Sequence, residues 1–62
     1  MDDKQKFLKA LINNKGQMDE YTLGEAIGFA QDKTKIIIDE LVNEGKIEFQ
    51  SMGLCSYRVL SL

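Results

Sequence analysis

Apolar residues recur at a helical period in the first part of the chain. Over residues 3–14 they are spaced i, i+1, i+4, i+5, with lysines and an asparagine on the other side, which predicts an amphipathic helix. The same period predicts a short helix over residues 20–28 and a longer one over residues 32–44. A glycine stands at the end of each segment or just beyond it, where its tolerance of positive φ suits a helix end.

Polar residues suited to helix capping lie at the start of the second and third segments. Thr22 and Glu25 have the Thr-x-x-Glu spacing of a capping box, in which two side chains satisfy free backbone amides. Asp19 offers an earlier start to the same helix. Asp32 is the better N-cap candidate for the third helix.

The third helix has one apolar face and one outlying isoleucine. Ile36 lies almost opposite the apolar sector, and Gly28 and Phe29 form the turn into this helix. We expect Gly28 to adopt positive φ and to leave no room for a Cβ, and Phe29 to fill the corner between the helices. The expected core residues fall within a sector about 140° wide: Thr34, Ile37, Ile38, Leu41 and Val42.

After Gly45 the period of the apolar positions changes to two, which is typical of half-buried strands. Strands are predicted over residues 46–50 and 55–60, joined by a glycine-containing turn over residues 51–54. A hairpin is marginal alone, so it must pack one face on the helices. The side chains expected on that face are Ile47, Phe49, Cys55, Tyr57 and Val59.

This order of elements resembles a winged helix-turn-helix domain of the kind found in small prokaryotic transcriptional regulators, including the MarR-like families. The resemblance covers residues 23–59: a first helix and turn at residues 23–29, Leu-Gly-Glu-Ala-Ile-Gly-Phe, a recognition-like helix from Thr34 to Leu41, and the exit Leu-x-x-x-Gly-x-Ile at residues 41–47. It implies an α+β fold in which a three-helix core carries a C-terminal β-hairpin wing. Residues 1–62 would then form a single domain in a cytoplasmic protein of a prokaryote or a phage.

Composition excludes several classes of function. The chain has no His and one Cys, so a Cys/His metal site and a Cys-His nucleophile pair are excluded, and no metal or cofactor is expected. The carboxylates have no visible catalytic counterpart, so we do not expect an enzyme. No apolar run approaches the roughly 20 residues of a membrane span. Cys55 is expected to be a small core residue, with redox sensing as a minor alternative.

The winged-helix resemblance implies DNA binding, with the third helix in the major groove of double-stranded DNA. Gln31 suits adenine, the two lysines suit guanine, and Ile36 can touch a thymine methyl group. The remaining candidates would contact phosphates. The complete set of predicted DNA contacts is Gln31, Lys33, Lys35, Ile36, Lys46, Ser51 and Arg58.

Charge argues for a second interpretation, a protein-interaction module that does not bind DNA. The chain has 8 Lys and Arg against 10 Asp and Glu, a formal net charge of −2, whereas DNA-binding domains are commonly basic. The predicted wing loop carries no Lys or Arg. Ile36, Met52 and Leu54 would then be exposed apolar contacts for a partner. A homodimer through the first helix, or through Leu60 and Leu62, is a further possibility.

Overall fold

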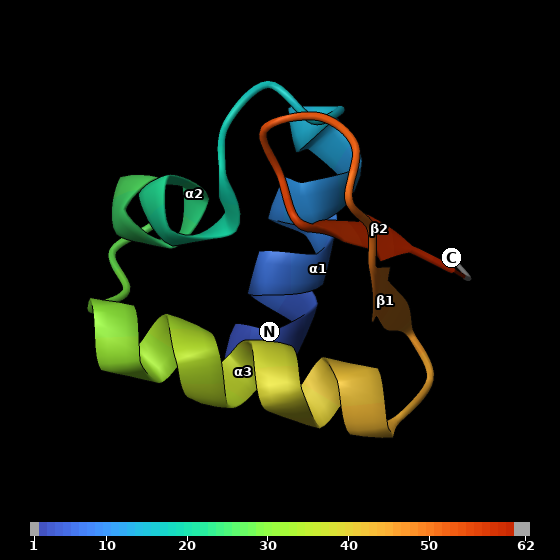
Figure 1. The fold of residues 1–62 in the computed structure, drawn as a ribbon. Helices are drawn as coiled ribbons and strands as arrows, with labels where there is room; N and C mark the ends of the chain where they lie inside the picture. The colour runs from blue at the N-terminus through green and yellow to red at the C-terminus, as the bar shows by residue number, and fades with distance from the viewer. Residues whose placement is uncertain (1, 61–62) are drawn as a thin grey trace.

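The computed structural model describes residues 2–60, and these form three helices followed by a two-stranded antiparallel hairpin (Figure 1). The elements are α1 (Asp3–Asn14), α2 (Glu20–Ala26), α3 (Gln31–Asn43), β1 (Ile47–Phe49) and β2 (Tyr57–Val59). The layout is α+β and consistent with a winged helix, so the predicted fold class is confirmed. The predicted bounds of α1 agree with the observed ones, and the other predicted bounds differ by at most two residues, as is usual at frayed ends. Leu62 lies outside the described residues.

The helix starts differ in part from the predicted ones. Asp2 caps α1 by accepting a hydrogen bond from the Gln5 amide at 2.8 Å. Asp19 caps α2, because its carboxylate accepts from the amides of Tyr21 and Thr22. The prediction of a capping box at Thr22 is therefore wrong. Thr22 lies inside α2, and its hydroxyl donates to the Asp19 carboxylate. Two amides within reach of one carboxylate outweigh the single cap that a threonine can supply.

The N-cap prediction for α3 is also wrong. Ala30 occupies the cap position and makes no side-chain hydrogen bond. Asp32 lies in the first turn, where its carboxylate accepts from the Lys33 amide at 2.9 Å. A carboxylate in the first turn still interacts favourably with the positive end of the helix dipole, so Asp32 supports the start of α3 without capping it.

The core lies where the three helices meet the first strand. Phe7, Leu41 and Ile47 come from α1, α3 and β1 and are almost fully buried. Phe29 is buried in the corner before α3 and stacks on Phe7 with ring centroids 6.5 Å apart. Of the residues expected on the inner face of α3, all are buried except Val42, which lies at the edge of the apolar sector near the end of the helix.

Helices α2 and α3 approach each other closely at Gly24 of α2. A Cβ placed there would lie 2.1 Å from the Thr34 Oγ1 of α3. Thr34 is fully buried, and its hydroxyl donates to the Ala30 carbonyl at 3.1 Å. Gly28 has φ +92°, as predicted, but nothing lies within 4 Å of a Cβ there. Gly28 is therefore favoured by its positive φ, whereas Gly24 is required because a side chain would collide with α3.

The hairpin follows the predicted alternation but extends past the core. Ile47 pairs with Val59 and Phe49 pairs with Tyr57, so all four share one face. Ile47 is 1% exposed, whereas Phe49 is 67% exposed and meets Tyr57 edge to face. The prediction that Phe49 packs inward is wrong, because the strand leaves the helices behind within two residues.

Candidate functional site

The N-terminal half of α3 carries four of the predicted DNA contacts at the surface. Gln31, Lys33 and Lys35 are exposed on its first two turns, while Thr34 and Ile37 bury the opposite face against α2 and α1. Ile36 is 59% exposed, as expected from its position opposite the core sector. The helix is thus held from behind and presents its outer face to solvent.

Each predicted DNA-contacting cation is already paired with a carboxylate of the same chain. Lys33 Nζ lies 2.5 Å from Asp3 Oδ2, and Lys35 Nζ lies 3.3 Å from Asp39 Oδ2. The other two pairs, Lys46 with Glu44 and Arg58 with Glu48, lie at the exit from α3 and on the hairpin. All of these side chains are at least one third exposed, so the pairs are surface ion pairs.

The ion pairs keep their carboxylates charged. The hydrogen bond from Lys33 lowers the pKa of Asp3 below its usual value. Hydrogen bonds from Lys4 and Lys46 lower the pKa of Glu44 in the same way. A DNA phosphate that takes over one of these cations therefore leaves a solvated anion behind.

The structure adds a cation that the sequence pattern does not connect to α3. The ammonium of Lys6, from α1, lies 5.7 Å from the centroid of the Phe29 ring, and that of Lys33 lies 4.9 Å from the same centroid. Both distances are within the range of cation–π attraction. One aromatic ring at the start of α3 thus gathers two lysines from different helices, and no spacing in the sequence could have indicated this contact.

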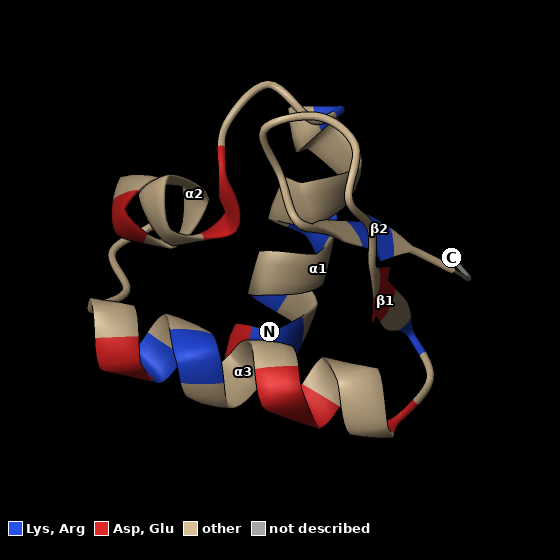
Figure 2. Cartoon of the chain, in the orientation of Figure 1, with Lys and Arg blue, Asp and Glu red and all other residues tan. Residues whose placement is uncertain are grey.

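Charge is distributed unevenly along the described chain. Residues 2–15 carry four lysines against two aspartates, a net of +2, and residues 16–60 carry four cations against eight carboxylates, a net of −4. Figure 2 shows that the lysines of α3 lie in its N-terminal half, next to the acidic Asp32 at the helix start, and that Asp39 and Glu40 follow in the C-terminal half. The C-terminal half of α3, with Asp39 and Glu40, is therefore the less suitable surface for DNA.

The hairpin loop presents a different kind of surface. Residues 49–57 contain no charged side chain, and Met52 and Leu54 are 78% and 69% exposed. Ser51 is exposed in the same loop. The loop lies at the opposite end of the molecule from α3 (Figure 1), so the structure does not bring Ile36 together with Met52 and Leu54.

Ile36 instead belongs to a shallow hollow between α3 and the start of α1. Ile36 and Ile37 supply its apolar floor, and the charged groups around it belong to Lys33, Glu40 and residues 2–4. An apolar centre with a charged rim is the usual composition of a small protein contact. This hollow adjoins the lysines of α3, so DNA and a protein partner could not both use the site.

The described residues offer little for catalysis or metal binding. Cys55 is buried, its thiol donates to the Tyr57 carbonyl at 3.3 Å, and burial raises its pKa above the usual value. A thiol of this kind forms little thiolate and reacts slowly. Within residues 2–60 no three His, Cys, Asp or Glu side chains converge into a possible metal site, and no helix there is long and apolar enough to cross a membrane.

Comparison of the chain with protein-family models, with curated proteins and with solved structures gives no match. The function must therefore be inferred from the residues of this chain and their geometry.

Proposed function

We propose that this protein binds double-stranded DNA by placing the N-terminal half of α3 in the major groove. The observation that supports the proposal is the exposed first half of α3, where Gln31 and Lys35 face solvent and Lys33 and Lys6 flank the Phe29 ring. Gln31 and Lys35 have the donors and acceptors needed to read base edges, and Lys6 and Lys33 suit phosphates.

The ion pairs at this surface are compatible with the proposal. An exposed pair contributes only about 0–1 kcal/mol to stability, so Lys33 and Lys35 lose little when they exchange Asp3 and Asp39 for phosphates. Lys6 makes no ion pair among residues 2–60, and it can contact phosphate without giving up a partner. Binding should nevertheless be weak, because a net charge of −2 gives no long-range attraction.

The proposal makes a quantitative statement about salt. With three to four phosphate-contacting cations, drawn from Lys6, Lys33, Lys46 and Arg58, the slope of log K against log salt should be about −3 to −4. Replacing one contacting lysine should make that slope less negative by about one. A surface that binds DNA without these lysines would not show this change.

The test measures fluorescence anisotropy of a labelled random-sequence duplex over a range of salt. Lys33→Gln and Lys6→Gln should each weaken binding and flatten the salt slope. Lys15→Gln is the matched control, because it removes the same charge at the far end of α1. Equal losses for Lys15→Gln and Lys33→Gln, or no binding at low salt, would contradict the proposal.

A protein partner is the second candidate, and the uncharged hairpin loop with Met52 and Leu54 favours it. One substitution separates the two functions by whether it changes the affinity for DNA. Ile36→Lys adds a cation to the outer face of α3, so it should strengthen DNA binding if α3 faces phosphate and bases. If α3 instead contacts a protein through Ile36, the same change leaves DNA affinity unaltered.

A further inference from the structure

The outer edge of β2 has free backbone hydrogen-bonding groups. The Gln50 amide donates to the Ser56 carbonyl at 2.7 Å, and the Leu60 amide donates to the Lys46 carbonyl at 2.8 Å. In an antiparallel ladder, bonded and non-bonded pairs alternate, so Tyr57 and Val59 direct their amides and carbonyls away from β1. The Tyr57 carbonyl accepts from the Cys55 thiol. The two amides and the Val59 carbonyl have no hydrogen-bond partner among residues 2–60.

Residues 15–18, which follow α1, do not form a strand on this edge of β2. Lys15 and Gly16 both adopt positive φ, +53° and +76°, which turns the chain after α1. The buried Asn14 side chain then bonds both the amide and the carbonyl of Met18, at 2.9 and 2.8 Å. Met18 is thereby satisfied by a side chain, and residues 15–18 form a turn rather than a third strand.

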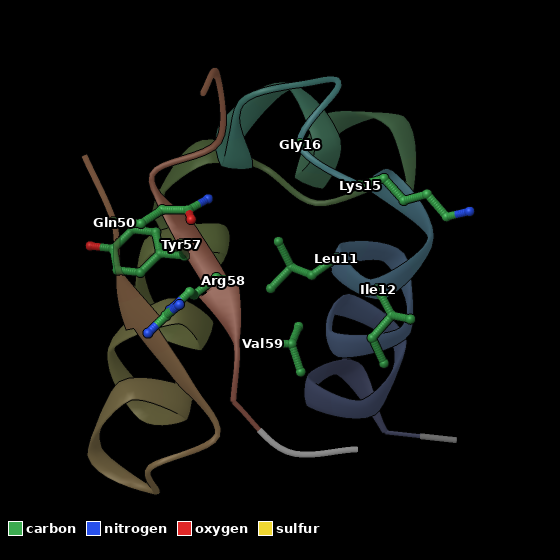
Figure 3. A pocket seen from close by; sticks show the side chains of 8 residues that line it. All are labelled: Leu11, Ile12, Lys15, Gly16, Gln50, Tyr57, Arg58 and Val59. Carbon is green, nitrogen blue, oxygen red and sulfur yellow. The ribbon is translucent and has the colours of Figure 1, made fainter. Parts of the chain in front are cut away.

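A groove runs between α1 and the hairpin on the side of β2. It has a volume of about 360 Å³, which is within the range of peptide and ligand sites. Figure 3 shows Leu11 of α1 and Val59 of β2 pointing toward one another across it, with Ile12 beside them. The lining is mixed, because Lys15, Gln50 and Arg58 accompany these aliphatic residues. Aliphatic side chains next to unpaired strand groups are an arrangement used to bind an extended peptide as an added strand.

The charge of the groove indicates the chemistry of its occupant. Its lining includes Lys15 and Arg58 and no carboxylate. Glu20, an acidic side chain beside the start of β2, already accepts a hydrogen bond from the Ser56 amide at 3.0 Å. Arg58 forms an ion pair with Glu48, whereas Lys15 makes no ion pair among the described residues. An acidic segment is therefore preferred over a basic one.

We propose that β2 accepts an extended segment of a partner protein as a third strand, and that this segment alternates apolar and acidic residues. The strand would pair with the free groups of Tyr57 and Val59 and place its apolar side chains against Ile12, which is exposed, and Val59, which is partly buried. The proposal does not depend on DNA binding, since α3 and this groove share no residue.

The test uses the full chain and the synthetic peptide acetyl-Glu-Val-Glu-Val-Glu-amide, followed by amide NMR and hydrogen exchange. The Tyr57 and Val59 amides should exchange rapidly in the free protein. Millimolar peptide should shift both amides, slow their exchange at least tenfold and leave Gln31–Lys35 unmoved. The same peptide with N-methylated valines should not bind, because it cannot form the ladder, and a lysine version should bind at least several-fold more weakly.

A matched pair of variants locates the binding to the groove. Ile12→Asp places a carboxylate on the groove wall and should abolish peptide binding, while Asn13→Asp, on the outer side of α1, should not. Three results would overturn the proposal: tight protection of the Tyr57 and Val59 amides in the free protein, no response to the acidic peptide, or equal binding of the N-methylated peptide. Circular dichroism of both variants establishes that any loss is not unfolding.

Discussion

The apolar pattern of the sequence predicts burial well in the α2–α3 corner and less well in the hairpin. In the corner, Leu23, Phe29 and Thr34 are all buried, and the inner face of α3 stays buried from Thr34 to Leu41. In the hairpin, residues of one face change from 1% exposed at Ile47 to 67% exposed at Phe49. The period of the apolar positions therefore predicts which side chains are buried in the corner, whereas in the hairpin it predicts only the face on which a side chain lies.

The largest effect is expected when two positions on the same strand face are compared. Ile47→Ala should lower the free energy of unfolding by about 2–5 kcal/mol, as a large-to-small change in a core does. Phe49→Ala should cost less than about 1 kcal/mol, because it loses mainly an edge-to-face contact with Tyr57. Urea denaturation followed by circular dichroism measures both. Similar losses for the two variants would show that Phe49 is buried in solution.

The second test compares two glycines of the corner. Gly24→Ala should destabilise the protein by about 1–3 kcal/mol, because its Cβ would collide with the buried Thr34. This sign is opposite to the gain of about 1 kcal/mol that alanine normally brings inside a helix. Adding Thr34→Ala should restore part of the loss.

Gly28→Ala is the control for that steric effect. Nothing lies within 4 Å of a Cβ there, so only the positive φ opposes the substitution. Its cost should be about 1 kcal/mol, and Thr34→Ala should not relieve it. Relief of both glycine variants by Thr34→Ala would contradict the distinction between packing and conformation.

The smallest test concerns the cap of α2 and its dependence on pH. The Thr22 hydroxyl, together with the amides of Thr22 and Tyr21, lowers the pKa of Asp19 below 3.8. A carboxyl whose pKa is lower in the folded state stabilises the fold above its unfolded pKa, and that stability is lost as the pH falls through the folded pKa. Wild type should therefore lose more stability than Asp19→Asn on acidification below about pH 4.

Asp19→Asn retains an N-cap, so the two proteins should be of similar stability at neutral pH, whereas Asp19→Ala should lose about 0.5–2 kcal/mol at any pH above the pKa. The pairs of Asp3 and Glu44 are present in all of these proteins, so the difference isolates Asp19. Parallel stability curves for wild type and Asp19→Asn would contradict the role of the charged cap.

Local patterns predicted most of the fold, and contacts between distant segments account for what they missed. Helical period and glycine positions located the three helices, and the change of period located the hairpin. The Thr-x-x-Glu pattern at Thr22 misled because Asp19, one turn earlier, reaches two amides. Phe49 misled because alternation does not report how far a strand extends beyond the core.

The candidate site was predicted less completely, for a similar reason. The sequence indicated that Lys33 and Lys35 are surface residues of α3 able to contact DNA. The contacts of Lys33 with Asp3 and of Lys6 with Phe29 join segments more than twenty residues apart. Only the packing of α1 against α3 determines them, and no local spacing encodes that packing.

The most direct test of the proposed function is an amide NMR titration of the protein with duplex DNA at low and at moderate salt. DNA binding through α3 predicts shifts concentrated at residues 31–37 and at Lys6, and these shifts should weaken as salt rises. Met52 and Leu54, at the far end of the hairpin, should move little. Absence of shifts on α3 at low salt, or shifts confined to the hairpin loop, would contradict the proposal.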